Sequence, residues 1–263
     1  MKKWSKRLTW LWTVRQEESG KQISLYIRKQ GVKAIWQGGE SHPLTGFSFN
    51  AVSNYEKALG LDLVRVVSCN TTGLCRVITP IDRELGVKKV RVTIARRAVD
   101  PNDIKKGPIN AIVLDPVKLP SHHGPDVMSV LPQINITSTA LKIPTTLMHM
   151  HVVNMEVNTD CTAETIKKIF SSQSRIRFVG QGITSTAEIM EVARDIKRPR
   201  NDMWENCIWP ESITVNEKEL YFFQAIHQES IVVPENVDAI RAMMELESDG
   251  AKSIEKTNKA IGL

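Results

Sequence analysis

The chain has 263 residues, of which 41% are hydrophobic and 24% are charged. This composition is typical of globular proteins, so it excludes a wholly disordered chain and allows one large domain or two modest ones. No window contains the ~20 consecutive apolar residues of a membrane-spanning helix, which argues against a membrane protein. The net charge of +6 is spread along the chain, so it argues against a nucleic-acid binder and leaves small phosphate-bearing ligands open.

The four cysteines do not follow the spacing of a disulfide scaffold or a metal site. None of them forms a C-x-x-C pair, so we expect no zinc ribbon, no redox pair and no bound metal. So few cysteines in a chain of this length are typical of a reducing compartment, and we expect a cytoplasmic protein. The N-terminal residues begin with charges, but their apolar run is short and lacks a small-residue cleavage site, so they do not predict a signal peptide.

The first half of the chain predicts strands and helices in alternation. A short apolar run at 32–36 predicts a strand that ends in the turn Gln37-Gly-Gly-Glu40, and a short helix is expected over 54–61. The β-branched run 63–67 predicts a buried strand, followed directly by a helix over 70–85 that Pro80 kinks or splits. Alternation over 89–95 predicts a half-buried strand, whereas the Pro and Gly residues of 101–136 predict a long loop.

The second half predicts a further mixture of short strands and amphipathic helices. Two strands are expected within 139–157, and others at 175–179, 212–215 and 220–226. Helical spacing predicts helices over 162–171 and 184–197, and one or two more within 234–261.

The most informative short segment is Ser68-Cys69-Asn70, because it joins a buried strand to a helix. A cysteine there lies where α/β sheets bind their ligands. The helix dipole and the unpaired N–H groups favour an anion, which predicts a thiol pKa lowered from ~8.5 toward the range ~3.5–7.5. The same N–H groups can stabilise an oxyanion on a carbonyl that the sulfur attacks. Cys69 is therefore a candidate nucleophile, and the alternative is a small buried packing residue.

A thiol nucleophile needs a proton acceptor, and two histidines are candidates. His149 and His151 lie two residues apart in a predicted strand, so they face the same side of it. The nearest carboxylate, Glu156, points to the opposite face, which argues against a metal site. We expect one of the two histidines to be the base and the other to be structural.

Two further segments have both a functional and a structural interpretation. The segment Ser121-His-His-Gly-Pro-Asp126 is either a plain loop or a grip for a phosphate group. The pair Arg96-Arg97, at the end of the alternating strand, is either solvated surface or a clamp for an oxyanion.

Several of these segments together resemble a known family. They are Gln37-Gly-Gly-Glu40, Ser68-Cys-Asn-Thr-Thr-Gly-Leu-Cys-Arg76, the Arg-Arg pair, Lys106-Gly-Pro-Ile-Asn-Ala111, Pro120-Ser-His-His-Gly-Pro-Asp126, Pro144-Thr-Thr-Leu-Met-His-Met-His151 and His227-Gln-Glu-Ser230. In this order they resemble the archaeal-type phosphorylating glyceraldehyde-3-phosphate dehydrogenases. The resemblance runs from about Gly31 to the C-terminus and leaves residues 1–30 as an unmatched leader.

The resemblance implies oxidation of D-glyceraldehyde 3-phosphate to an acyl phosphate, with inorganic phosphate as second substrate and NAD or NADP as cofactor. It makes Cys69 the nucleophile that forms a thioester and His149 the base. It also implies binding roles: the substrate is held by Ser68, Asn70, His123 and Gly124, and the cofactor lies near Gly39, Arg97 and Gln228.

The resemblance implies a fold of the α/β plus α+β class. A partial Rossmann-type parallel lobe, residues 31–68 joined by a C-terminal helix at 234–263, precedes a mostly antiparallel catalytic domain, residues 69–233, with helices on one face. A homotetramer is expected on the same ground. The first 30 residues contain no G-x-G-x-x-G motif, so we expect the N-terminal part of the dinucleotide-binding domain to be missing. The alternatives are a truncated remnant that folds or co-assembles without binding cofactor, and a Cys69 thiol hydrolase or acyltransferase.

Overall fold

The computed structural model of the chain describes residues 27, 29–38, 41–98 and 107–263. The chain forms two compact units, one comprising Met1–Ser68 with Val232–Leu263 and the other comprising Cys69–Ile231. Each unit has its own sheet. None of the helices in the described residues is long and apolar enough to span a membrane.

The first unit is built on a three-stranded parallel sheet with the strand order β1-β3-β2. Every residue of the central strand β3 is buried, which explains its mostly apolar sequence. This sheet confirms the predicted parallel lobe of Rossmann type. The unit contains β1 (Ala34–Gln37), β2 (Ser48–Phe49), α2 (Ala51–Asn54), β3 (Leu63–Val66), α7 (Val233–Met243) and α8 (Gly250–Ile261).

The helix predicted over 54–61 is wrong in its boundaries. The chain forms α2 and then a separate 3-10 helix over Tyr55–Ala58. Asn54 explains the break, because its φ of −151° and ψ of 32° leave helical geometry. Its side chain accepts a hydrogen bond from the Asn50 N–H at 3.0 Å and donates one to the Ser48 carbonyl at 2.9 Å, so it bonds to the backbone before the helix.

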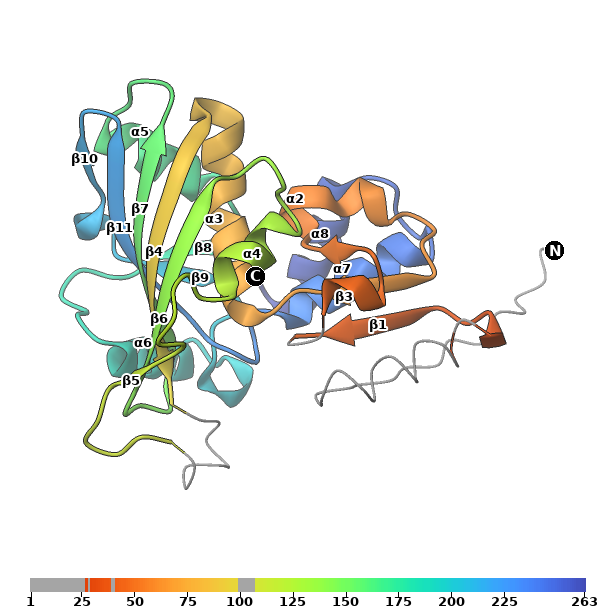
Figure 1. Cartoon of the computed structure of the whole chain (residues 1–263), viewed down its shortest axis with the longest axis horizontal. Helices are drawn as coiled ribbons and strands as arrows, with labels where there is room; N and C mark the ends of the chain where they lie inside the picture. The colour runs from red at the N-terminus through yellow and green to blue at the C-terminus, as the bar shows by residue number, and fades with distance from the viewer. Residues whose placement is uncertain (1–26, 28, 39–40, 99–106) are drawn as a thin grey trace. The chain divides into compact units, whose positions relative to one another are not determined.

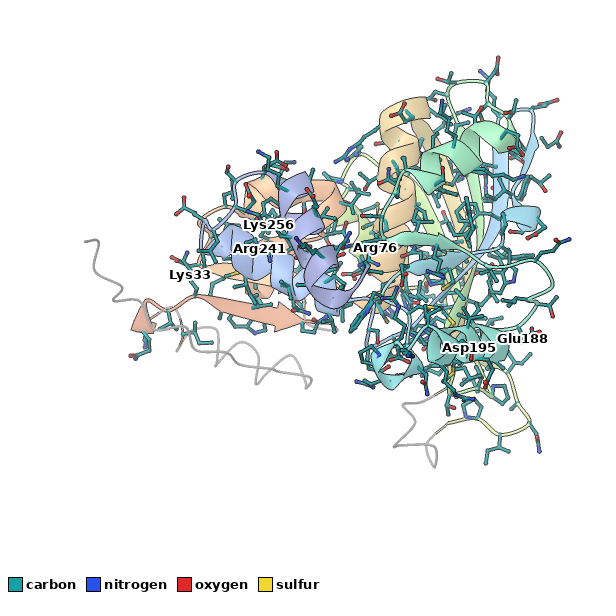
Figure 2. All side chains as sticks on the ribbon, turned by 180° about the vertical axis from the view of Figure 1, so that it is seen from behind. Lys33, Arg76, Glu188, Asp195, Arg241 and Lys256 are labelled. Atoms are coloured by element: carbon teal, nitrogen blue, oxygen red, sulfur yellow. The ribbon has the colours of Figure 1, made fainter. Side chains whose placement is uncertain are left out.

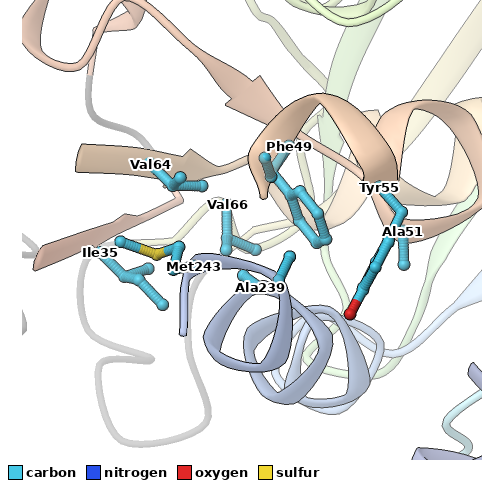
Figure 3. Packing of buried hydrophobic residues seen from close by; sticks show 10 residues of the cluster. Ile35, Phe49, Ala51, Tyr55, Val64, Val66, Ala239 and Met243 are labelled. Atoms are coloured by element: carbon cyan, nitrogen blue, oxygen red, sulfur yellow. The ribbon is translucent and has the colours of Figure 1, made fainter. Parts of the chain in front are cut away.

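The core of the first unit lies between its sheet and α7. Figure 3 shows Ile35, Val64 and Val66 of the sheet beside Ala239 and Met243 of α7. All five side chains are at most 8% exposed. Since buried apolar area stabilises the fold by roughly 25 cal/mol per Å², this cluster fixes a C-terminal helix against strands from the beginning of the chain.

A buried carboxylate joins α7 to α8. Asp238 is fully buried, and its Oδ1 accepts hydrogen bonds from Ser253 Oγ at 2.8 Å and from Thr257 Oγ1 at 2.6 Å. The Arg241 guanidinium lies 3.2 Å from the same oxygen. Because this charge is paired and hydrogen-bonded, the carboxylate holds the two helices together rather than destabilising them.

Replacing this carboxylate is expected to be costly. Asp238→Ala should lower the free energy of unfolding by about 3 kcal/mol, because Arg241 loses its counter-ion and two buried hydroxyls lose their acceptor. Equilibrium urea unfolding measures the change. Glu255→Ala, at an exposed position of α8, is the matched control and should change the same free energy by less than about 0.5 kcal/mol. Equal unfolding free energies for the two variants would contradict the role of Asp238.

The second unit contains an eight-stranded, mostly antiparallel sheet, as predicted (Figure 1). The strand order is β5-β6-β4-β7-β11-β9-β8, with β10 paired to β11, and the pairs β4–β6 and β8–β9 are parallel. Its strands are β4 (Val87–Arg97), β5 (Val113–Leu114), β6 (Ile136–Ile143), β7 (His149–Val157), β8 (Ile176–Phe178), β9 (Asn206–Ile208), β10 (Thr214–Asn216) and β11 (Glu219–Ile226). Its helices are α3 (Cys69–Leu85), α4 (His123–Met128), α5 (Ala163–Ser171) and α6 (Thr186–Asp195).

Helix α3 lies along one face of this sheet, against β4, β7 and β11 (Figure 1). Side chains of β7 alternate accordingly: His149 and His151 are buried, whereas Val152 is 44% exposed. Pro80 does not split the helix, which was one of the two predicted outcomes, because α3 is continuous over its full length. A proline inside a helix costs about 3 kcal/mol, and tertiary packing of the whole helix offsets that cost.

The loop predicted over 101–136 is wrong in part. Its first six residues lie outside the described residues, but the remainder contains β5 and α4. Gly124 and Pro125 resemble loop residues in the sequence, yet they stand in the first turn of α4, where a helix needs no N–H from proline. The strand β5 has two residues and the unpredicted β9 has three, too few for a periodic pattern.

Helix α6 packs on the other face of the sheet at one end, where Ile189 contacts the same apolar cluster as Cys207. It begins with a capping box that the sequence analysis did not identify: Ser185 Oγ accepts from the Glu188 N–H, and the Glu188 carboxylate accepts from the Ser185 N–H. Figure 2 labels Glu188 and Asp195 on this helix, in its first and last turns. The helix predicted over 184–197 is therefore confirmed.

Candidate active site

Cys69 is the first residue of α3 and follows β3 by three positions in the chain. The structure thus confirms the expected place of this cysteine, after a buried strand and at the start of a 17-residue helix. Its side chain is partly buried, and so is that of Ser68, the residue directly before the helix. The first N–H groups of a helix have no intrahelical acceptor, so they are available beside the sulfur.

The thiol of Cys69 differs from the sequence-based expectation in its acidity. Burial raises the pKa of this thiol to about 11, although Arg96, the Asn70 backbone and Arg97 all act to lower it. The predicted lowering of the pKa is therefore wrong, because desolvation of the thiolate outweighs the positive charges and the helix start. At neutral pH the resting sulfur carries its proton.

His149 is held by the backbone of the neighbouring strand. The Arg97 N–H donates to His149 Nδ1 at 3.0 Å. A backbone N–H is always a donor, so the neutral ring carries its proton on Nε2. That Nε2 is buried and has no hydrogen-bond partner among the residues that the structure describes. Burial holds the pKa of His149 well below its usual value, so the ring is neutral and offers one unused N–H donor.

His151, two residues further along β7, has no unused ring nitrogen. The Gln224 amide nitrogen lies 2.9 Å from its Nδ1, and its Nε2 lies 2.9 Å from the Asn70 Oδ1. The ring is fully buried, and this burial lowers the pKa of His151 to about 3. Of the two histidines that the sequence left as alternatives, only His149 has a ring nitrogen without a hydrogen-bond partner in the described part of the chain.

Asn70, His123 and Gly124 come together beside the start of α3. The Asn70 amide nitrogen lies 3.2 Å from His123 Nε2, and His123 Nδ1 lies 3.3 Å from Ser121 Oγ. The Gly124 N–H donates to Ser138 Oγ at 2.7 Å. The structure therefore gathers these three predicted substrate residues, with both ring nitrogens of His123 already engaged.

Two cations continue the row of His149 across the sheet, both on its β4 side. Arg96 on β4 pairs in register with Lys142 on β6, and both contact the Asp115 carboxylate, Lys142 at 3.5 Å. Ala95 pairs with Met150, so Arg96 and His149 occupy the next positions on their strands. The Nε of Arg96 is buried and has no partner in the described part of the chain. One carboxylate against two cations leaves a net positive charge next to His149.

Arg97, predicted to lie near the cofactor, forms a cluster with the segment after β11. Its Nε donates to Gln228 Oε1 at 2.7 Å, and its guanidinium contacts Glu229 at 2.5 Å. The structure thus brings Arg97 and Gln228 together, two of the residues that were predicted to lie near the cofactor. Gly39, the third predicted cofactor residue, lies outside the described residues.

Sequence reasoning missed several residues of this arrangement, including Lys142, Asp115 and Gln224. Each is distant in the chain from the residue that it contacts, and only the strand register brings the two together. No local motif contains that information. The strand alternation did place His149 and His151 on one face, but it could not show which of them has an open nitrogen.

Comparison with known proteins agrees with this geometry. A family model described as the C-terminal domain of glyceraldehyde 3-phosphate dehydrogenase matches residues 68–216. A relative from Methanosarcina acetivorans, glyceraldehyde-3-phosphate dehydrogenase 1, is 89% identical over 235 residues, which cover 89% of this chain and 70% of the relative. The Methanosarcina mazei enzyme is 86% identical over the same coverage, and that of Methanobrevibacter smithii is 55% identical over 90% of this chain and 70% of its own length. The chain belongs to the glyceraldehyde-3-phosphate dehydrogenase family.

Proposed function

We propose that the chain converts D-glyceraldehyde 3-phosphate and inorganic phosphate to 1,3-bisphosphoglycerate, with NAD or NADP as cofactor. One observation carries this proposal. The same two arginines act electrostatically on a cysteine at a helix start and on a histidine whose N–H has no partner among the described residues. Arg96 and Arg97 are the charges that most influence the pKa of Cys69, and both also influence that of His149. Such a cluster of thiol, imidazole and cations suits addition to a carbonyl.

Cys69 is the nucleophile of the proposed reaction. Its S–H bond breaks, the proton leaves to solvent, and the sulfur bonds to the aldehyde carbon. The aldehyde oxygen then carries a negative charge, which the Nε2–H of His149 stabilises. After loss of hydride the carbon is a thioester of Cys69, and an oxygen of inorganic phosphate attacks it and releases the thiolate. We therefore assign His149 first as a hydrogen-bond donor, whereas the resemblance alone suggested a base.

The described residues around the end of β1 fit one part of a dinucleotide site. Gly38 follows the last residue of β1 and has a φ of +80°. Among the described residues, its chain neighbours aside, no atom lies within 4 Å of the position that a Cβ would take. The carboxyl ends of parallel strands are where α/β sheets bind nucleotides, and exposed glycine backbone permits close approach. A bound NAD or NADP supplies the hydride acceptor. Gly39, Arg97 and Gln228 are the residues that we propose to hold it.

We propose that phosphate groups bind beside His149. Arg96 and Lys142 offer a net positive charge there, and the Arg96 Nε has no partner among the described residues. Arginine and lysine are the usual ligands of phosphate dianions. The remaining proposed substrate contacts come from residues around the helix start: Ser68, Asn70, His123 and Gly124.

We also propose that copies of the chain assemble, as a tetramer by resemblance. The sheet face opposite α3 exposes Val152, Tyr221 and Phe223, each between 40% and 47% exposed. Neighbouring apolar side chains on an uncovered sheet are typical of an interface. Sedimentation of the chain measures the assembly, and a Phe223→Lys variant is expected to shift it toward monomer.

A spectrophotometric assay tests the proposed reaction. Glyceraldehyde 3-phosphate, phosphate and NAD or NADP are expected to give continuous NADH or NADPH formation, and omission of phosphate should stop it after one turnover. A remnant without cofactor binding would give no fluorescence change on titration with either nucleotide. A thiol hydrolase would cleave activated esters at an unchanged rate without nucleotide. Either of these last results would overturn the proposal.

A further inference from the structure

We propose that Gln224 and His151 are positioning residues, which orient the Asn70 amide through a chain of one-directional hydrogen bonds so that its nitrogen faces the substrate of Cys69. The identity of that substrate rests on the proposed function. The hydrogen-bond chain itself does not.

A backbone carbonyl of α3 sets the direction in which the hydrogen bonds of this series are donated. The Gly73 oxygen accepts from Asn206 Nδ2 at 2.7 Å and from Gln224 Nε2 at 3.3 Å. A carbonyl only accepts, so both amides must present their nitrogens to it. Asn206 Nδ2 also donates to Gln224 Oε1 at 2.8 Å, which fixes the Gln224 amide from its other side.

Each following bond then has only one possible polarity. Gln224 Nε2 donates to His151 Nδ1 at 2.9 Å, so the His151 proton is on Nε2 and is donated to Asn70 Oδ1 at 2.9 Å. With its oxygen committed, Asn70 presents its nitrogen to His123 Nε2 at 3.2 Å. The Gln224 amide on β11 therefore determines the orientation of the Asn70 amide, and the His151 ring transmits this effect.

The far end of the chain agrees with this direction. Since His123 Nε2 accepts, its Nδ1 carries the proton and donates to Ser121 Oγ at 3.3 Å. Ser121 Oγ lies 2.8 Å from Ser138 Oγ, which itself donates to the Ser121 carbonyl at 3.0 Å. The series of hydrogen bonds thus starts at an amide donor and ends at a carbonyl acceptor. At each step a donor faces an acceptor.

One N–H of the Asn70 amide is not used by the described residues. Its Nδ2 carries two hydrogens, and one of them is used by His123. The second has no acceptor among the described residues, although the side chain is only 2% exposed. A buried, unused N–H on the residue after Cys69 is suited to an oxygen of a substrate bonded to that sulfur.

Gly73 permits α3 to pack closely on β7 and β11, and the series of hydrogen bonds depends on this packing. A Cβ at this position would lie 3.0 Å from Ile226 Cγ2 and 3.5 Å from the His151 ring carbon Cε1. The first of these contacts is tighter than ordinary van der Waals contact, so the Ile226 side chain would have to give way. The glycine therefore lets the part of α3 that carries this carbonyl pack closely on β11 and β7.

The test reverses the direction of the hydrogen bond between Gln224 and His151 by a substitution that keeps the size of the side chain. Gln224→Glu offers His151 Nδ1 an acceptor in place of a donor. A neutral His151 then moves its proton to Nδ1, loses its donor to Asn70, and lets the Asn70 amide turn. We expect kcat/KM for glyceraldehyde 3-phosphate to fall about tenfold to a hundredfold at pH 8. Gln181→Glu, an exposed glutamine with the same charge change, is the control and is expected to leave it unchanged.

The effect is expected to depend on pH. The new carboxylate raises the pKa of His151 in the variant, and the protonated ring donates from both nitrogens, which restores the Asn70 orientation. The deficit of Gln224→Glu should therefore shrink as the pH falls from 8 to 6. His149 and His123 are the titratable groups that interact with His151, and both are neutral over this range because burial lowers their pKa values. A deficit that is independent of pH would overturn the proposal.

Two substitutions of His151 provide a second readout. His151→Gln can accept from Gln224 and donate to Asn70, so it should retain at least about a third of the wild-type kcat/KM, whereas His151→Leu should lose about tenfold to a hundredfold. Nitrogen-15 NMR of the wild-type chain should show His151 protonated on Nε2 alone. A proton on Nδ1, or equal losses in both variants, would overturn the proposal. Absence of all activity in the wild type would overturn the proposed function, and the NMR result would still decide on the hydrogen-bond chain.

Discussion

Cys69→Ser is expected to lower the steady-state rate on the order of 10⁴-fold or more, because the hydroxyl that replaces the thiol is a much weaker nucleophile. The fold should be unchanged, since the side chain is only partly buried and serine is of similar size. Initial rates of NADH or NADPH formation measure the loss, and circular dichroism verifies the fold. Cys161→Ser, a second partly buried cysteine, is the matched control and should keep the wild-type rate.

The pH dependence of alkylation tests the state of the same sulfur. With a pKa of about 11, only about one Cys69 in 10⁴ is a thiolate at pH 7. The rate of Cys69 alkylation by iodoacetamide should therefore increase continuously as the pH rises from 7 to 10. Arg96→Gln removes the charge that lowers this pKa most, so the variant should react more slowly still. A rate that is already constant at neutral pH would contradict the raised pKa.

His149→Phe is expected to lower kcat about 10²- to 10³-fold, because the oxygen of the aldehyde loses the N–H that stabilises its negative charge. His149→Gln distinguishes a donor from a base. A glutamine amide still donates a hydrogen bond but does not accept a proton, so it should recover about tenfold of the rate if His149 is a donor. Equal rates of the two variants would show that His149 acts as a base. Since burial lowers the pKa of His149 well below its usual value, the wild-type rate should show no titration of this ring between pH 5 and 8.

The sequence predicted the fold best where the hydrophobic pattern is long. The alternation of β4 and β7 is visible in the sequence, and it placed His149 and His151 correctly on one face. The position of Cys69 between a buried strand and a helix was also predicted correctly. Its acidity was not, because the helix dipole is a local property, whereas desolvation depends on the side chains that tertiary packing brings around the sulfur.

The rest of the candidate site depends on contacts between segments far apart in the chain. Lys142 joins Arg96 only through the register of β4 and β6, and Gln224 reaches His151 only through that of β7 and β11. Register is set by packing and by chain connections, which no short motif encodes. Helix α4 was missed for a different reason, since its first turn is made of residues that usually form loops.

The protonated state of the Cys69 sulfur has a consequence for damage by oxidants. A thiolate attacks hydrogen peroxide and is oxidised by it, whereas a neutral thiol reacts very slowly. A resting sulfur with a pKa of about 11 is therefore a poor target for sulfenic acid formation at neutral pH. In the reaction that we propose, the sulfur is most exposed to oxidation when the acyl product leaves, because it is then briefly an anion.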